Sequence, residues 1–233
     1  MLTAYPLIAL NYIMKAKNPK KNQLEAILRV LNGGGVVVAP TDTVYGLLAD
    51  ASQEGAVSKL LRIKGRNEKK GIPIFIPSLA YAKTIALVSS KDEAFLDHVW
   101  PGKVTAILRL RPDAALAQNT LTGDGTVGLR IPAYQLLRDL LETYKKPLTG
   151  TSANRSGLPS CLDTACIKKQ LGALPDLIVE GGILPAAQAS TIVDLTKEPY
   201  KIIRSGAGDE VVKGWAEKSK CQNPNVKSNP KLK

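Results

Sequence analysis

Residues 33–46 read GGGVVVAPTDTVYG. The β-branched run that begins at Val36 is typical of a strand covered on both faces, and the glycines before it indicate the end of a helix. Pro40 to Thr43 then place two hydroxyls and one carboxylate at the end of this strand. Thr, Asp and Pro are ordinary turn residues, so the stretch alone indicates a turn. A row of hydroxyls at a strand end can also form the rim of a binding site.

Helical and strand patterns alternate along the rest of the chain. Asn22 is expected to cap a helix that carries Leu24, Ile27, Leu28 and Leu31 on one face. Further helices are predicted at residues 54–63, 91–99, 134–144 and 209–218, and further strands at residues 72–76, 104–110, 126–131, 147–152, 176–182, 190–195 and 200–206. This interleaving predicts one α/β domain with a largely twisted mixed sheet.

The charge is concentrated at the two ends of the chain. The net charge is +12 over 233 residues, of which residues 1–22 carry +4 and residues 213–233 carry +5, leaving +3 for residues 23–212. We expect an N-terminal extension at 1–21, a folded domain at 22–218, and a basic, disordered tail at 219–233. Basic ends on a nearly balanced body indicate nucleic-acid binding less directly than a basic stripe over the whole domain would.

Cysteine and histidine content argues against a metal site or a catalytic thiol. Cys161, Cys166 and Cys221 lack metal-ligand spacing, and reduced thiols in a cytosol-like compartment are the simplest interpretation. The only histidine, His98, has helical spacing and is expected to be a packed or solvated helix residue. No apolar run approaches the roughly 20 residues that span a bilayer. We therefore expect a cytoplasmic protein without membrane contact, with an organellar location as the alternative because the first 24 residues lack acidic side chains.

Three more polar stretches adjoin the predicted strands. In KGR, an extended backbone would point Lys64 and Arg66 the same way, toward one anion, whereas a basic helix end in solvent is the simpler alternative. TSANRSG, residues 151–157, can offer donors to a nucleotide or amino acid, or can form an Asx turn. Arg130 lies within an apolar strand and needs a partner, either a ligand carboxylate or Asp42. Walker-type, GxSxG and HExxH patterns are absent from the sequence, and no GxGxxG pattern follows a predicted strand.

Taken together and in order, these stretches resemble a known family. The segments are PTDTVYGLLADA, IKGR, WPGKVTAIL, GTVGLRIP, TSANRSGLPS, STIVDL and IIRSG. They resemble the YrdC-like domain of threonylcarbamoyl-AMP synthases in its single-domain form, over roughly residues 24–208. The resemblance implies a twisted mixed sheet with flanking helices around a basic concave cavity. It also implies a nucleotidyltransferase that joins L-threonine, bicarbonate and ATP, with Mg²⁺, into threonylcarbamoyl-AMP and pyrophosphate.

The resemblance further implies roles for individual residues, and it assigns no metal ligand. The catalytic set would be Lys64, Arg66, Ser152 and Asn154; the threonine set Thr41, Arg130, Ser152 and Ser190; and the ATP set Lys64, Arg66, Thr126, Asn154 and Arg204. The product would supply the N6-threonylcarbamoyladenosine modification of tRNA, with tRNA or double-stranded RNA and a downstream transferase complex as further partners.

Three positions depart from the family pattern. Gly71 stands where proline is frequent, Cys161 lies where a Ser-Pro-Thr run is common, and Ser205 replaces the proline of an Arg-Pro-Gly run. Because these positions flank the expected nucleotide region, a second hypothesis stays open. It is an RNA-binding or regulatory member of the family without this activity, which the basic ends favour and the lack of an aromatic stacking set opposes.

Overall fold

The structure, a computed structural model, describes residues 19–65, 71–185 and 188–221. Its helices are α1 (Pro19–Asn32), α2 (Glu54–Lys64), α3 (Leu79–Ile85), α4 (Ser90–Val99), the 3₁₀ turn η1 (Gln118–Thr120), α5 (Gln135–Tyr144), α6 (Thr164–Leu171) and α7 (Asp209–Cys221). Its strands are β1 (Val37–Ala39), β2 (Gly46–Leu48), β3 (Ile74–Phe75), β4 (Ala86–Leu87), β5 (Val104–Leu110), β6 (Thr126–Arg130), β7 (Leu148–Thr149), β8 (Thr151–Ser152), β9 (Leu177–Ile178), β10 (Thr191–Asp194) and β11 (Lys201–Arg204). The interleaved α/β class is confirmed.

The strands form two mixed sheets, where the sequence predicted one. One sheet has the order β8-β2-β1-β9, and the other has the order β11-β10-β5-β6-β3-β7, with β4 paired to β5. The two sheets meet where the end of β2 lies beside β7. At this point the Thr149 N–H donates a hydrogen bond to Ala49 O at 2.9 Å. The division arises at glycine-containing bends such as Gly150, which separates β7 of one sheet from β8 of the other.

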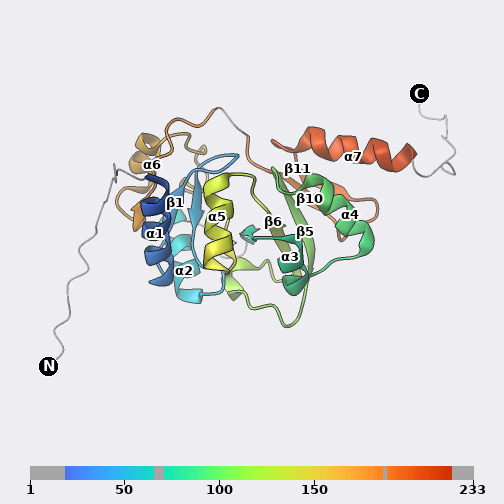
Figure 1. Cartoon of the computed structure of the whole chain (residues 1–233), viewed down its shortest axis with the longest axis horizontal. Helices are drawn as coiled ribbons and strands as arrows, with labels where there is room; N and C mark the ends of the chain where they lie inside the picture. Colours follow the sequence, from blue (N-terminus) through green and yellow to red (C-terminus); the bar gives the residue numbers. More distant parts are fainter. Residues whose placement is uncertain (1–18, 66–70, 186–187, 222–233) are drawn as a thin grey trace.

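Helices cover both sheets and bury three apolar clusters. One cluster joins the longer sheet to α3 and α4, a second joins the shorter sheet to α2 and α6, and a third lies between α1, α5 and the neighbouring strands. Figure 1 shows α4 and α7 beside β10 and β11 at one end of the molecule, and α1 and α6 at the other. Between these ends, residues of both sheets face one another, which is where the candidate site lies.

Several predicted boundaries were wrong. The first helix begins at Pro19, so Asn22 lies inside it and does not cap it; proline suits the first turn because that turn needs no N–H donor. The last helix continues to Cys221, so the first residues of the expected tail are helical, while residues 222–233 lie outside the described part of the chain. Helices α3 and α6 were not predicted. None of the described helices is both long and apolar enough to span a membrane.

The expectation of three reduced thiols was also wrong for two of them. Cys161 and Cys166 form a disulfide with an S–S distance of 2.08 Å. Cys166 is held at the start of α6 by the capping residue Asp163, whose Oδ1 accepts from the Cys166 N–H at 2.7 Å. Cys161 is buried in the cluster beneath the shorter sheet. The pairing follows from this packing, because sequence spacing alone does not define disulfide connectivity.

A buried carboxylate joins the two sheets to α5. Asp50 is fully buried, and its Oδ1 accepts from the backbone and hydroxyl of Ser52, while its Oδ2 accepts from Tyr144 Oη at 2.8 Å and Lys146 Nζ at 3.2 Å. Burial raises the pKa of Asp50, but the hydrogen bonds from Ser52, Tyr144 and Lys146 outweigh it, so the net pKa is lowered. The ionised carboxylate is therefore the form that the fold stabilises.

Asp50→Asn should lower the free energy of unfolding by about 2–3 kcal/mol at pH 7, because the amide cannot accept all of these hydrogen bonds. A carboxyl group whose pKa is lower in the folded state than in the unfolded state stabilises the fold at pH values above its unfolded-state pKa. This stabilisation is lost as the pH falls through the folded-state pKa. The stability difference between wild type and variant should therefore shrink below about pH 4. Denaturant titrations at pH 7 and pH 3.5 measure it, with exposed Asp97→Asn as the control. Equal stability of Asp50→Asn and wild type at pH 7 would contradict the assignment.

Candidate active site

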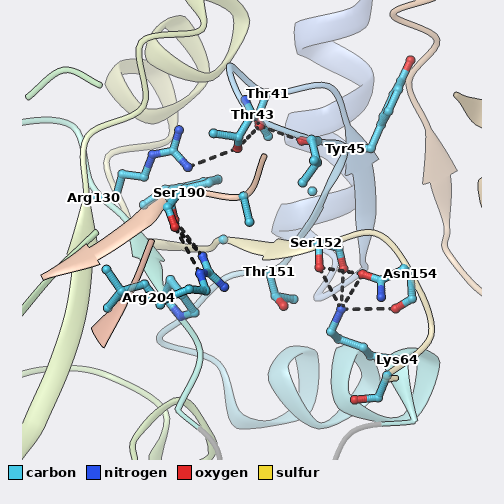
Figure 2. Close-up of a pocket in the computed structure, with 18 of the residues that line it drawn as sticks. Thr41, Thr43, Tyr45, Lys64, Arg130, Thr151, Ser152, Asn154, Ser190 and Arg204 are labelled. Carbon is cyan, nitrogen blue, oxygen red and sulfur yellow. Dashed lines mark hydrogen bonds between the residues drawn. The ribbon is translucent and has the colours of Figure 1, made fainter. Parts of the chain in front are cut away.

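A cavity of about 270 Å³ lies between the two sheets. Its lining comes from the loop after β1, the end of α2, the segment around β8, and the ends of β6, β10 and β11. Among the described residues that line it, three are cations, Lys64, Arg130 and Arg204, and none is acidic. Figure 2 shows Lys64 with Ser152 and Asn154 on one side, Ser190 with Arg204 on the other, and Thr41 and Thr43 above them. The cavity suits anionic ligands.

The PTDT stretch is both a turn and part of the cavity wall. It belongs to the six-residue connection between β1 and β2, whose register pairs Ala39 with Gly46. The Thr41 hydroxyl donates to Val44 O at 2.6 Å and accepts from the Thr43 N–H at 3.0 Å, which closes the turn. Both threonines nevertheless line the cavity. The two interpretations of this stretch are therefore compatible, with the hydroxyl of Thr41 engaged inside the turn.

Arg130 is held at the end of β6 by three acceptors. Its Nη2 donates to Asp42 Oδ1 at 2.6 Å, its Nε to Gly102 O at 2.8 Å and its Nη1 to Thr43 Oγ1 at 3.3 Å. Burial lowers the pKa of Arg130, and the Asp42 carboxylate opposes that shift. The guanidinium stays charged, since arginine does not deprotonate in proteins. Asp42 is thus the partner of Arg130 in this structure, one of the two alternatives considered from the sequence.

Lys64 joins the end of α2 to the TSANRSG loop. Its Nζ donates to Ser152 O at 2.5 Å, Asn154 Oδ1 at 3.1 Å and Asn154 O at 3.2 Å, and lies 3.4 Å from Ser152 Oγ. The Asn154 amide nitrogen donates to the carbonyls of Arg155 and Leu158, which fixes the loop further. The β2–β8 register, which pairs Gly46 with Ser152, brings this loop next to the PTDT turn.

Of the two alternatives for KGR, the structure has a helix end and not an extended segment, but Lys64 is buried and not in solvent. Lys64 is the last residue of α2, and Gly65 caps the helix in the left-handed region at φ 61°. Glycine adopts that region without the steric cost of a side chain, so the helix ends here. Lys64 therefore points from a helix terminus and not from a strand. Arg66 lies outside the described residues.

The opposite wall is built on the register of β10 and β11. Ile192 pairs with Arg204, which brings the Arg204 side chain beside Ser190 just before β10. Arg204 donates to Ser190 O from Nε at 3.1 Å and from Nη2 at 2.7 Å, and to Ser190 Oγ from Nη2 at 3.2 Å. Ser190 and Arg204, far from Lys64 in the sequence, thereby reach the same cavity.

Thr126 lies in a separate, smaller cavity. This space of about 100 Å³ is also lined by Thr105, Thr120 and Thr122, and it shares Gly71, Pro73 and Ile192 with the main cavity. A Cβ atom at position 71 would lie 2.7 Å from Thr122 Cγ2, so the glycine permits the close approach of these two loops. The departure from proline at this position therefore affects the boundary between the two cavities.

Seven of the nine predicted site residues come together in the main cavity. They are Thr41, Lys64, Arg130, Ser152, Asn154, Ser190 and Arg204. Thr126 borders the adjacent cavity, and Arg66 is not described. Thr43 lies in the predicted PTDT rim, although no separate role was assigned to it. Sequence reasoning missed Tyr45 and Thr105, of which Thr105 left a signal, as a hydroxyl in the otherwise apolar run VTAIL. Across the described ranges, no group of three or more His, Cys, Asp or Glu side chains could hold a metal ion.

Comparison with known proteins identifies the class. The family model for Sua5/YciO/YrdC proteins, described as "Telomere recombination", matches residues 29–206, and the chain belongs to this family. A threonylcarbamoyl-AMP synthase from Vibrio vulnificus is 32% identical over 189 residues, covering 79% of this chain and 99% of the relative. One from Pyrococcus abyssi is 32% identical over 175 residues, covering 74% of this chain and 51% of the relative. The chain thus spans about half the length of the archaeal relative.

The fold of the domain agrees with a solved structure from the same family. The crystal structure of P. abyssi Sua5 complexed with L-threonine matches with a TM-score of 0.75 and 29% sequence identity, covering 80% of this chain and 54% of that chain. The resemblance inferred from the motifs is therefore confirmed, as is the mixed α/β architecture of the YrdC-like type.

Proposed function

We propose that this protein is a threonylcarbamoyl-AMP synthase, a nucleotidyltransferase that uses L-threonine, bicarbonate and ATP. The observation that carries the proposal is one cavity that Lys64, Arg130 and Arg204 line together with hydroxyl and amide groups, and to which no acidic residue of the described ranges contributes. Relatives with this name match most of the chain. A concave pocket with converging polar groups supports a small-molecule reaction more strongly than RNA binding alone.

The chemistry requires positioning more than a protein nucleophile. The threonine amine and bicarbonate form a carbamate with loss of water; a carbamate oxygen then attacks the α-phosphorus of ATP. The bond from that phosphorus to the β-phosphate bridging oxygen breaks, and pyrophosphate leaves with the bonding electrons. Arg130 and Ser190 are proposed to hold the threonine carboxylate, and Lys64 and Arg204 to offset the developing phosphate charge.

Five further residues complete the proposed assignments. Thr41 and Ser152 are proposed to contact threonine, Asn154 to hold the nucleotide side through the loop fixed by Lys64, and Thr126 to contact ATP from the adjacent cavity. Arg66, two residues after Lys64, is proposed on the resemblance alone to contact the departing pyrophosphate.

Mg²⁺ is proposed to enter as part of the ATP substrate. Protein-bound Mg²⁺ usually has one or two carboxylate ligands in addition to phosphate oxygens. The described residues that line the cavity offer hydroxyl, amide and carbonyl oxygens but no carboxylate, so this described lining does not fit a resident magnesium site. We therefore assign no residue of this chain as a metal ligand.

The product is proposed to pass to a transferase that modifies tRNA. The basic residues after 219 are proposed to favour association with RNA.

We propose the cytoplasm as the compartment. The Cys161–Cys166 disulfide argues against it, because such bonds are uncommon in cytosolic proteins. Counting free thiols in protein isolated under alkylating conditions addresses this point.

Pyrophosphate release should require L-threonine and bicarbonate together with ATP, because the carbamate is the attacking group. The test measures pyrophosphate while each substrate is omitted in turn, in bicarbonate-depleted buffer where appropriate. We expect release only with all three. ATP turnover at full rate without threonine would exclude the proposed reaction.

A further inference from the structure

Thr105 contacts Ser190 of the main cavity wall and borders the smaller cavity. It is the second residue of β5 and is 1% exposed. Its hydroxyl lies 2.9 Å from Ser190 Oγ, and no other partner of this hydroxyl occurs among the residues that the structure describes. A Cβ atom at Gly128 would lie 3.4 Å from Thr105 Cγ2, so the glycine of β6 leaves room for this side chain.

Counting protons defines the direction of the bond between Thr105 and Ser190. A hydroxyl has one proton and two acceptor positions, and a buried proton without an acceptor is unfavourable. If Ser190 donated, the Thr105 proton would have no acceptor in the described part of the chain. We therefore assign Thr105 as the donor to Ser190 Oγ, which also accepts from Arg204 Nη2 at 3.2 Å. Both acceptor positions of Ser190 are then used, and its own proton remains for the cavity.

We propose that Thr105 is a positioning residue that makes Ser190 a dedicated hydrogen-bond donor to the carboxylate of the amino-acid substrate. This inference rests on the proposed function. Ser190 and Arg130 line the same cavity. Because both acceptor positions of the Ser190 hydroxyl are occupied, Ser190 can only donate a hydrogen bond to a ligand, as can the Arg130 guanidinium. A carboxylate, which only accepts, matches this arrangement, whereas a carboxamide brings an NH₂ group for which the pair has no acceptor.

The test compares L-threonine with L-threoninamide by isothermal titration calorimetry of the full chain. Thr105→Val keeps the shape and removes the hydroxyl. It should weaken L-threonine binding about 5- to 10-fold, the equivalent of one hydrogen bond, and reduce the preference for L-threonine over L-threoninamide by a similar factor. Thr105→Ser, which keeps the hydroxyl, should stay within about twofold of wild type in both measurements.

Thr164→Val is the matched control, because Thr164 is also buried and its hydroxyl donates to Glu180 Oε2 at 2.7 Å outside either cavity. It should leave both affinities unchanged. If Thr105→Val does not fold, Thr105→Ala serves the same purpose with the same expected result. A folded hydroxyl-free variant that retains wild-type affinity and preference would overturn the role of Thr105 while leaving the proposed reaction intact. A wild-type protein that neither binds L-threonine nor releases pyrophosphate would overturn both.

Discussion

Lys64→Met should reduce kcat/KM for pyrophosphate release by about 10²- to 10³-fold, or roughly 3–4 kcal/mol of transition-state stabilisation. Lys64 is buried at the end of α2, and its ammonium has four oxygen neighbours from Ser152 and Asn154 within 3.4 Å. Methionine has a similar length but donates no hydrogen bond. The variant would therefore lose both a cation near the transferring phosphate and the bonds that hold the loop.

Lys59→Met is the matched control for this prediction. Lys59 lies one and a half turns earlier on the same helix and pairs with Asp176 at 2.6 Å, with both side chains about one-third exposed. Such a surface pair contributes about 0–1 kcal/mol, so this variant should retain activity. Steady-state kinetics and melting curves of both variants separate catalysis from stability. A Lys64→Met enzyme with near wild-type turnover would show that Lys64 only shapes the loop.

Arg130→Met should lower the free energy of unfolding by about 3–5 kcal/mol, because it leaves the carboxylate of Asp42 buried without its partner. The Arg130–Asp42 pair is 2.6 Å apart, with side chains 3% and 9% exposed. The same variant should weaken L-threonine binding by about 10²-fold, if Arg130 also meets the substrate carboxylate. Chemical denaturation and calorimetry measure the two effects.

A double variant, Asp42→Asn with Arg130→Met, separates these two roles. Removing both charges should recover much of the lost stability, since neither partner is left as an unpaired buried charge. Asparagine also keeps an oxygen for the Ala133 N–H, which donates to Asp42 Oδ2 at 3.2 Å. Threonine binding should remain weak. Recovery of both stability and binding in the double variant would mean that Arg130 serves the fold alone.

The sequence predicted the parts of this fold that have long periodic patterns. The β-branched run at β1 and the leucine-rich face of α5 were identified because burial imposes their spacing. Helix α6 was missed because it has only 8 residues, and its start depends on the capping side chain of Asp163. The division into two sheets was missed because strands of two or three residues, such as β8, carry no periodicity.

The candidate site was predictable as a set of residues but not as a geometry. Motif order identified Lys64, Arg130 and Ser190, but which side chains contact each other depends on strand register. The pairing of Ile192 with Arg204 brings Arg204 to Ser190, and no local pattern encodes it. Thr105 was overlooked for the same reason, because its partner lies 85 residues away. The helical position of Lys64 depends on Gly65, which can equally occur in an extended loop.

Mass spectrometry of the product formed from ATP, L-threonine and ¹³C-labelled bicarbonate tests the central claim most directly. The proposed reaction inserts the bicarbonate carbon between the threonine nitrogen and the α-phosphate of AMP. We expect threonylcarbamoyl-AMP, heavier by a single mass unit than the product made with unlabelled bicarbonate, and an equal amount of pyrophosphate. Formation of ADP and phosphate, or of AMP without a threonine adduct that carries the label, would contradict the assignment of this cavity as a threonylcarbamoyl-AMP synthase site.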